Sequence, residues 1–445
     1  MMMHTLLANA DFVIQRKGAF LRRASVCIRD HCIEAVGDAT ELDRRFPGAS
    51  RIDCSGCILL PGLINAHSHL YQILLRGLGK RYSLFDWITR LTYPVARQLT
   101  APAHDVAARL ACLDAFRNGI TAVVDMPTHY ARFHASTVFR ALQEAGIRGA
   151  VVCAGSDASS VDPGETRSLE QDLQAAAAFL DRHQGSGVLQ AWLGPSGFHS
   201  ASPDLLRRMK RLAVDRGVRF HVHLGESARG RDCARARGYA GEVAWAHSLG
   251  LLDAHTSVAH GIWVSEAEAE AFCRSGAQLV HNPTSNQVLA SGVADIGRMR
   301  TMGIPLALGS DGPASNDALD MFGEMKAAIL LQRVSTLDPL ALTAADAFEM
   351  CTEGGARVLG IKNLGCIDTG YLADVVAVRA RDNPSLTPIY DPIESLVYHG
   401  SGRDVVLTMV HGRIVYRWGA FLTLDSAEIF SRVGQIHDDI ARIVA

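Results

Sequence analysis

The stretch Leu60-Pro61-Gly62-Leu63-Ile64-Asn65-Ala66-His67-Ser68-His69 is an apolar run that ends in two histidines. Side chains alternate between the two faces of a β-strand, so residues two apart point the same way. A strand over this stretch would aim His67 and His69 at one point in space. Two converging imidazoles can hold a divalent metal, and a solvated pair of loop histidines is the plain alternative.

Apolar strand-like runs alternate with helical patterns from about residue 60 to about residue 365. Eight such strand–helix units indicate a closed parallel barrel, and a doubly wound open sheet is the alternative. The open sheet usually carries a glycine-rich phosphate loop after its first strand, and no complete loop of this kind occurs. After the strand that ends near His67, the predicted strands are 120–125, 148–154, 189–193, 218–223, 256–260, 278–281 and 305–311.

The predicted helices of the barrel region are 135–145, 169–183, 203–216, 241–249, 265–275, 296–302, 321–334 and 341–359. Both ends of the chain differ from this region, because short alternating strands there are typical of a half-buried antiparallel sheet. The predicted strands at the ends are 6–14, 24–29, 32–36, 374–379, 396–398, 404–411 and 413–416, with a small helix at 40–45.

The sequence therefore predicts an α/β protein with a (β/α)8 TIM barrel and a small β-sandwich built from both chain ends. The expected parts are the first half of the sandwich (1–60), the barrel (61–365), the second half of the sandwich (366–424) and a C-terminal helix (425–445).

Composition excludes several classes of protein. The chain has 445 residues, 48% of them hydrophobic and 20% charged, which is typical of a globular enzyme. A net charge of −2 offers no polycation for nucleic acid. No apolar run is long enough for a membrane span and no signal peptide is evident, so a cytoplasmic protein is expected. Cys54 and Cys57 form one CxxC pair, whose plain interpretation is two structural cysteines.

Histidine and aspartate recur where the predicted barrel strands end. In a barrel, functional residues lie at the carboxyl ends of the strands, so these side chains should converge although they are far apart in sequence. Several independent strand ends make a metal site much more probable than chance. The residues at these ends are His67, His69, His221, His223, His260, His281 and Asp311.

Five motifs carry a resemblance to the amidohydrolase superfamily: PGLINAHSH, HVHLGES, VAHGIW, HNPTSN and LGSDGPASND. Within it the chain resembles the branch of triazine hydrolases and of guanine, 8-oxoguanine and adenosine-type deaminases. The resemblance implies His67, His69, His223 and Asp311 as metal ligands, Glu226 as a proton shuttle, and His260 as the group that polarises the attacked centre. His221 has the same strand parity as His223, and it is either a core residue or a supporting one.

The resemblance also implies one divalent metal, zinc or alternatively iron. Three imidazoles and a carboxylate suit either ion, and the bound metal would lower the pKa of a water toward about 7. Binuclear relatives bridge two metals with a lysine after the fourth strand, and Leu189 to Gly197 contains none. A single-metal site is therefore expected.

The substrate contacts expected from the resemblance are Gln72 and Trp87 after the first strand, His129 after the second and Asn286 after the seventh. The segment Gly79-Lys80-Arg81-Tyr82-Ser83 lacks the acidic pair of adenosine-type members, which favours a free base, pterin or triazine-like ring over a nucleoside.

The function implied is hydrolytic deamination of an aromatic N-heterocycle (purine, pterin, pyrimidine or triazine type) with release of ammonia. One alternative is displacement of chloride, alkylamine or thiomethyl from an s-triazine-like ring, and another is a non-catalytic scaffold. A small-molecule substrate is expected, with no nucleic-acid or membrane partner, and a homo-oligomer is expected by analogy with relatives.

Overall fold

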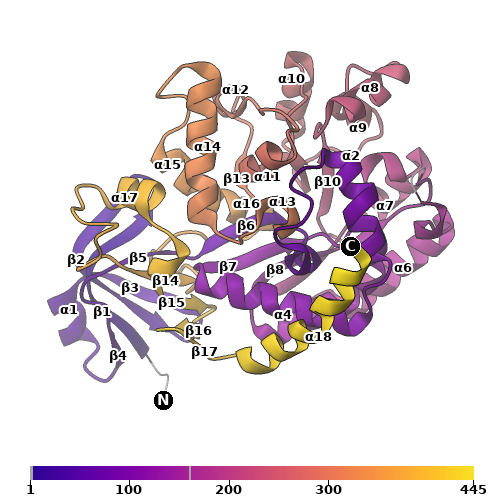
Figure 1. Ribbon diagram of the computed structural model, residues 1–445. Helices are drawn as coiled ribbons and strands as arrows, with labels where there is room; N and C mark the ends of the chain where they lie inside the picture. Colours follow the sequence, from indigo (N-terminus) through magenta and orange to yellow (C-terminus); the bar gives the residue numbers. More distant parts are fainter. Residues whose placement is uncertain (1–3, 160–161, 445) are drawn as a thin grey trace.

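Eight parallel strands form one of the two sheets of the computed structural model, which describes residues 4–159 and 162–444. Neighbours in this sheet are also neighbours in sequence, from β6 through to β13. Figure 1 shows helices arranged around these strands. The strands are β6 (Leu63–Ser68), β7 (Ile120–Asp125), β8 (Arg148–Gly155), β9 (Leu189–Pro195), β10 (Phe220–Leu224), β11 (Thr256–His260), β12 (Gln278–His281) and β13 (Leu306–Leu308).

The first and last strands of this sheet meet, so the sheet closes. The Asp311 N–H donates to the His67 carbonyl oxygen at 3.0 Å, and Ser68 forms a parallel bridge with Asp311. Beside this contact, the Asn65 carboxamide accepts from the Ser310 N–H at 2.9 Å and donates to the Ser310 hydroxyl at 2.7 Å. The predicted (β/α)8 barrel is confirmed, and the doubly wound open sheet is excluded.

The helices after the strands largely follow the predicted ranges. Three helices of the barrel begin with a capping box, Ser168 with Gln171, Ser265 with Glu268 and Thr343 with Asp346, which satisfies backbone N–H groups at the helix start. The helices between the barrel strands and after the last one include α4 (Ala101–Arg117), α5 (Ala135–Ala145), α6 (Leu169–His183), α7 (Pro203–Asp215), α9 (Glu242–Ser248), α10 (Glu266–Ser275), α12 (Ile296–Thr301) and α14 (Met321–Thr336). Additional helices in the loops are α2 (Leu84–Trp87), α3 (Tyr93–Ala96), α8 (Ala228–Ala236), α11 (Pro283–Val288) and α13 (Pro313–Asn316).

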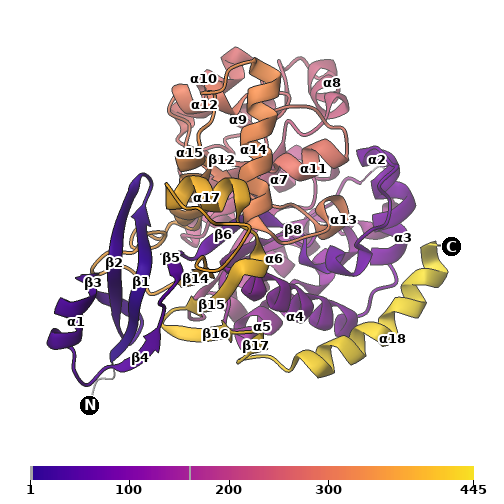
Figure 2. The same ribbon diagram turned by 60° about the vertical axis from the view of Figure 1, so that its left-hand side comes forward.

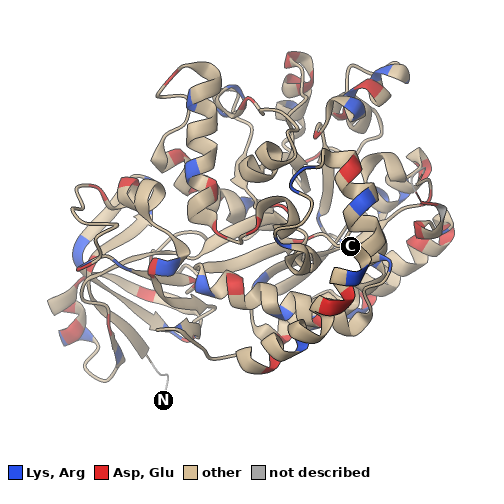
Figure 3. Cartoon of the chain, in the orientation of Figure 1, with Lys and Arg blue, Asp and Glu red and all other residues tan. Residues whose placement is uncertain are grey.

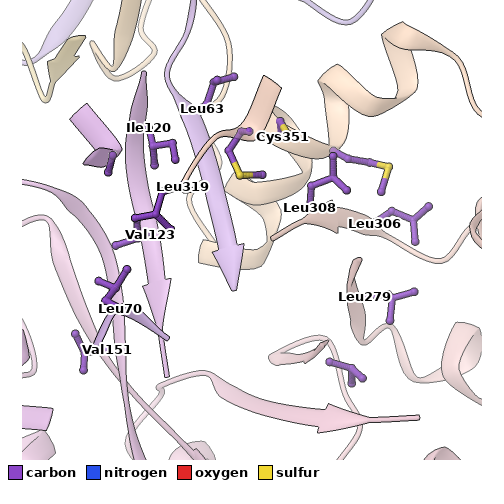
Figure 4. Packing of buried hydrophobic residues seen from close by; sticks show 14 of the residues in the cluster. Leu63, Leu70, Ile120, Val123, Val151, Leu279, Leu306, Leu308, Leu319 and Cys351 are labelled. Carbon is purple, nitrogen blue, oxygen red and sulfur yellow. The ribbon is translucent and has the colours of Figure 1, made fainter. Parts of the chain in front are cut away.

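Strand β7 is buried along its whole length and therefore on both faces, which explains its largely apolar sequence. Val123 of β7 packs in one cluster with Phe139 of α5, whereas its neighbours Ala122 and Val124 pack in another with Trp192. Alternate residues of this strand therefore pack into two different hydrophobic clusters. Figure 4 shows part of the first cluster, including Leu63, Ile120, Val123 and Val151.

The predicted helix 341–359 is three pieces, α15 (Ala344–Glu349), the π-helical turn η6 (Met350–Gly354) and α16 (Gly355–Leu359). A Cβ at Gly354 would lie 2.3 Å from the Leu306 carbonyl oxygen, and one at Gly355 would lie 2.5 Å from the Ile64 Cβ. Two consecutive glycines thus let this segment approach β6 and β13 closely, next to the seam where the barrel closes.

Both chain ends contribute to the second sheet, as predicted. Its order is β17-β16-β15-β14-β5-β1-β2-β3, with β4 also on β1. The junction is β5, which pairs parallel with β1 and antiparallel with β14. Figure 2 shows this sheet at one side of the barrel. The strands are β1 (His4–Arg16), β2 (Ala19–Arg29), β3 (Cys32–Asp38), β4 (Ser50–Asp53), β5 (Cys57–Pro61), β14 (Val375–Arg379), β15 (Val405–Val410), β16 (Arg413–Arg417) and β17 (Ala420–Phe421), with α1 (Ala39–Arg45) after β3.

This sheet is one continuous hydrogen-bonded sheet. Its two halves share an apolar cluster to which Leu7 and Val26 contribute from the N-terminal strands and Val375 and Leu407 from the C-terminal ones. The shared cluster explains why the two ends of the chain fold together.

One predicted strand was wrong, and one long helix was not predicted. The predicted strand 396–398 is part of the helix α17 (Pro392–His399), because the Asp391 side chain accepts from the N–H groups of Ile393 and Glu394 and caps the helix. Ile393, Leu396 and Val397 are buried on one face of α17, so their spacing is helical. The helix α4 was not predicted at all, because it is alanine-rich with polar residues spread along it.

The C-terminal helix α18 (Ser426–Val444) was predicted. It lies along α4 (Figure 1), where Ile429 packs with Val106 and Leu113, and Arg432 pairs with Asp105 at 3.0 Å. Figure 3 shows basic and acidic residues interspersed over the chain. No helix within the described residues is long and apolar enough to cross a membrane. The cytoplasmic location and the homo-oligomer stay predictions.

A buried ion pair joins the barrel to the second sheet. Arg148, at the start of β8, donates to both oxygens of Asp374 at 2.8 Å, and the two side chains are 4% and 1% exposed. The His411 N–H also donates to Asp374 at 2.8 Å. This carboxylate therefore connects three segments, one from the barrel and two from the second sheet.

We predict that Asp374→Ala destabilises the protein by about 3–5 kcal/mol, because it leaves the Arg148 cation buried without a partner. Thermal and urea unfolding, followed by circular dichroism, would measure the loss. The control is Glu170→Ala, which removes the exposed pair with Arg208 and should change stability by less than about 1 kcal/mol. Equal effects of the two substitutions would contradict this account of the domain junction.

Candidate active site

The predicted site residues converge at the carboxyl end of the barrel. His67 is the penultimate residue of β6, and His69 follows the strand directly. His223 lies in β10, and His260 is the last residue of β11. Asp311 follows β13 in the loop that closes the barrel. Because parallel strands end at the same rim, residues from four strands reach one point.

Two overlapping groups of side chains have ligand atoms within 4.8 Å of one another, His67 with His69 and His223, and His67 with His260 and Asp311. The His69 Nε2 lies 3.3 Å from the His223 Nε2 and 3.2 Å from the Asp311 Oδ1. The His67 Nε2 lies 3.4 Å from the same oxygen. These distances place several donor atoms around one point, as a divalent metal requires.

The Nδ1 atoms of His67, His69 and His260 each have a hydrogen-bond partner, which leaves their Nε2 atoms for the centre. The His69 Nδ1 donates to the Met126 carbonyl at 2.5 Å, and the His260 Nδ1 donates to the Asn286 Oδ1 at 3.0 Å. The His67 Nε2 is buried and has no hydrogen-bond partner. Lone pairs that face each other in this way repel unless a cation lies between them, so the residues fit a metal.

Electrostatics agree with this fit. Burial lowers the pKa of His67 to about 4 and that of His223 well below its usual value, so both imidazoles are neutral at pH 7. Burial alone would raise the pKa of Asp311, but the neighbouring His67 and His69 hold it well below its ordinary range. His67, His223 and Asp311 are thus in the protonation states that a metal site needs. Burial alone would lower the pKa of His69, but its bond to Asp311 raises it, so metal binding at His69 would be coupled to the loss of a proton.

Two of these residues have strained backbones. His260 has φ 78° and Asp311 has φ 60°, in the left-handed region that non-glycine residues rarely adopt. Such strain persists only where the surrounding structure enforces it, and it concentrates at functional sites.

Glu226 faces the same centre from the loop after β10. Its Oε2 lies 3.8 Å from the His260 Nε2, and the side chain lines the pocket. Burial raises the pKa of Glu226, which makes its carboxyl group better suited to carry a proton during the reaction.

Four of these residues, His69, His223, His260 and Asp311, line one pocket. Three of the four predicted substrate contacts, Gln72, Trp87 and His129, line it. A Cβ at Gly312 would lie 1.7 Å from the Gln72 Oε1, so the glycine lets this carboxamide lie against the backbone next to Asp311. Further lining residues are Leu84, Phe85, Ile88, Tyr93, Thr128, Ser159, Ser196, Phe198, His199, Ser227, Arg229, Cys233, Glu242 and Leu289.

Asn286 and His221 lie behind the site. Asn286 holds the His260 ring through the bond described above and does not line the pocket. The His221 Nε2 lies 2.8 Å from the His67 Nδ1, and its own Nδ1 lies 2.7 Å from the Ser257 hydroxyl. When His67 offers its Nε2, its Nδ1–H donates to His221, which donates in turn to Ser257. The structure thus places His221 as a support for His67.

Several polar residues in the pocket wall or directly behind it were not predicted. The buried Glu165 accepts from the hydroxyl of Tyr93 and from that of Ser196 (3.1 Å), and one of its oxygens lies 3.7 Å from the His129 Nδ1. His199 pairs with Glu242. These residues come from loops without a recognisable motif, so only their convergence in space identifies them.

Comparison with known proteins agrees with the geometry. The model of the amidohydrolase family matches residues 58–415. A 5-methylthioadenosine/S-adenosylhomocysteine deaminase of Syntrophobacter fumaroxidans is 35% identical over 413 residues, which cover 93% of this chain and 92% of that protein. A 5′-deoxyadenosine deaminase of Methanothermobacter thermautotrophicus is 35% identical over 410 residues, covering 91% and 92%.

Among solved structures, an adenosine deaminase from Xanthomonas campestris with bound zinc superimposes with a TM-score of 0.93 at 26% identity, covering 98% of each chain. The match of the family model spans most of the sequence, and the first relative aligns over nearly all of it. This chain therefore belongs to the amidohydrolase family.

Proposed function

We propose that this protein is a metal-dependent deaminase of an adenine-type nucleoside and that it releases ammonia. The observation that carries the proposal is the complete set of donors, His67, His69, His223 and Asp311, with Glu226 in the same pocket. The relatives at 35% identity are deaminases of adenine nucleosides, which supports this reaction class.

We propose one metal ion, zinc, with His67, His69, His223 and Asp311 as ligands. Zinc suits three imidazoles and a carboxylate, and the similar adenosine deaminase contains zinc. The segment that ends β9, from Leu189 to Pro195, has no lysine to bridge a second metal. When bound, the metal would supply an activated water at neutral pH.

The protein's own groups would move the protons. The ionised Asp311 can accept a proton from the water nucleophile. Glu226 can deliver its proton to a ring nitrogen, which makes the adjacent carbon more electrophilic. It can then take up the proton of the hydroxyl group that has been added to this carbon and pass it to the departing amine. His260, whose ring orientation Asn286 fixes, can steady the charge that develops on the attacked centre.

The relatives favour a nucleoside, although the segment from Gly79 to Ser83 favoured a free base. The pocket is also lined by Phe85, Phe198 and Arg229. The Arg229 guanidinium lies over the Phe85 ring at 4.2 Å, so this part of the wall combines aromatic surface with one cation.

We propose Gln72, Trp87 and His129 as the substrate contacts. Gln72 is 1% exposed and its Oε1 has no partner, and the buried Trp87 offers an indole N–H without a partner. His129 has φ 54°, and the centroid of its ring lies 4.3 Å from that of Tyr93. Its backbone N–H donates to the Ser196 hydroxyl at 2.8 Å. These three polar side chains can each bind a heterocycle or a sugar hydroxyl.

Two alternatives remain open to experiment. Displacement of chloride, alkylamine or thiomethyl from a triazine-like ring would use the same proposed metal ligands but would release no ammonia. A non-catalytic scaffold is disfavoured, because every ligand position is filled.

The direct test is ammonia release from a panel of 5′-methylthioadenosine, 5′-deoxyadenosine, adenosine, adenine, guanine, a pterin and melamine. We expect release from at least one adenine nucleoside, with a higher kcat/KM than for free adenine. Chloro- and thiomethyl-triazines, assayed for their own leaving groups, separate the displacement reaction. Turnover confined to these triazines, without ammonia from any amine, would overturn the proposal.

Asp311→Asn should lower kcat by about 100- to 10,000-fold, because the amide can neither accept a proton nor bind a cation as strongly. The shape of the side chain is unchanged, so the far-UV circular dichroism and the melting temperature should stay close to those of the wild type. Steady-state ammonia release would measure the effect, and near-normal turnover would exclude Asp311 from the reaction.

His129→Ala should raise KM for the best nucleoside by about tenfold, with kcat within about threefold, because one substrate hydrogen bond is worth about 1.4 kcal/mol. The matched control is His437→Ala, on the exposed side of α18, where the side chain is 76% exposed. A large loss of kcat with unchanged KM would place His129 in the chemical step and not in binding.

A further inference from the structure

We propose that Ser285 is a positioning residue that holds Asp311 in the orientation needed at the metal site. This inference rests on the proposed metal site, and it depends on the proposed reaction only for its kinetic consequence. Ser285 lies in the short helix α11, and its side chain is completely buried. It neither lines the pocket nor belongs to the predicted ligand set.

The contact between the two side chains is short. The Ser285 Oγ lies 2.6 Å from the Asp311 Oδ2 and 2.9 Å from the Ser315 Oγ. A hydroxyl has one proton, and a hydrogen bond to an ionised acceptor is stronger than one to a neutral acceptor. The Ser285 proton therefore goes to Asp311. The Ser315 hydroxyl donates its own single proton to the Gly312 carbonyl oxygen at 3.0 Å.

Because of this bond, the two oxygens of the Asp311 carboxylate have different partners. Oδ2 is taken by Ser285, whereas Oδ1 faces the Nε2 atoms of His67 and His69, at 3.4 Å and 3.2 Å. Without Ser285, Oδ2 would lose its donor in a buried place, and the carboxylate could turn about its χ2 torsion, which is broad for aspartate. Ser285 thus selects the orientation that presents Oδ1 to the site.

The backbone alone does not ensure this orientation. Asp311 has φ 60°, and the residues around it form an irregular loop between β13 and α13. A strained loop needs contacts that enforce its geometry. The hydrogen bond from Ser285 is one such contact, and it reaches Asp311 from a different strand–helix unit of the barrel.

The helix that carries Ser285 is itself fixed. Glu324 of α14 accepts from the Thr284 N–H at 3.3 Å and from the Asn316 carboxamide at 2.7 Å, and the latter also donates to the Ser310 carbonyl at 2.7 Å. One buried carboxylate therefore ties α11 to the loop that carries Asp311. The bond between Ser285 and Asp311 forms within this frame.

The neighbouring residue Asn286 accepts from His260, so two consecutive residues of α11 orient two separate groups of the site. This arrangement makes α11 a common support for Asp311 and His260. A substitution at Ser285 should disturb Asp311 and leave His260 in place, because each contact uses a different side chain.

The test is a double-mutant cycle read by zinc affinity, measured by competition with a chromophoric chelator. Ser285→Ala should weaken zinc binding by about tenfold when Asp311 is present, since the loss of a residue that orients a ligand typically costs 10–100-fold. In the Asp311→Asn background the same substitution should add no further loss. Ser285→Cys, which keeps the shape and a weaker donor, should lose less than Ser285→Ala.

The matched control is Ser291→Ala. Its hydroxyl is buried in the loop after α11 and has no hydrogen-bond partner, so we expect no change in zinc affinity. In steady-state assays with the active nucleoside, Ser285→Ala should lower kcat about tenfold and leave KM within about twofold.

Equal losses of zinc affinity in both backgrounds would show a general structural role, and an unchanged affinity in Ser285→Ala would show no role; either result overturns the inference. The zinc measurement needs no substrate. A wild-type protein that releases no ammonia but shows the predicted cycle would therefore refute the deaminase proposal alone.

Discussion

The hydrogen bond from the Asp311 N–H to the His67 carbonyl is the contact on which the rest of the site depends. It joins the first and last barrel strands, and the mutual bonds of Asn65 and Ser310, 245 residues apart, lie beside it. Without this seam the sheet would be open, and Asp311 would lie at an edge away from the histidines. The contact that closes the barrel therefore also brings Asp311 next to the histidines.

The same closure explains the electrostatic character of the site. It buries neutral imidazoles of His67 and His223 beside the ionised Asp311, although burial of a charge without a counter-charge is costly. The left-handed backbones of His260 and Asp311 add strain in the same place. A protein that maintains such an arrangement needs a compensating partner, and a divalent cation among the Nε2 atoms supplies one.

Predictions from the sequence were most accurate where a sequence pattern implies a fixed geometry. Strand parity and the rule that functional residues end barrel strands predicted where His67, His223 and Asp311 would converge. The sequence could not decide whether His221 is a core residue or a supporting one, because parity puts His221 and His223 on the same face of the strand. The contact between the His221 and His67 rings favours a supporting residue. The role of Asn286 also changed, from a pocket contact to a support of His260.

The remaining features depend on contacts that have no local signature. Glu165 supports the pocket wall from behind only because Tyr93, Ser196 and His129, which line the pocket, come to it from three other segments. The helix α17 was mistaken for a strand because its apolar residues are few and close together, whereas the cap at Asp391 fixes its true form. Contacts of this kind arise from tertiary packing, which local periodicity does not encode.

The central claim is that the groups brought together at the seam hold one divalent metal. Elemental analysis of the purified protein, by inductively coupled plasma mass spectrometry, tests it most directly. The account predicts close to one equivalent of zinc, or of iron in its place, per chain. A content far below one equivalent, in protein that neither binds added zinc nor gains activity from it, would contradict the account, and so would two tightly bound metals per chain.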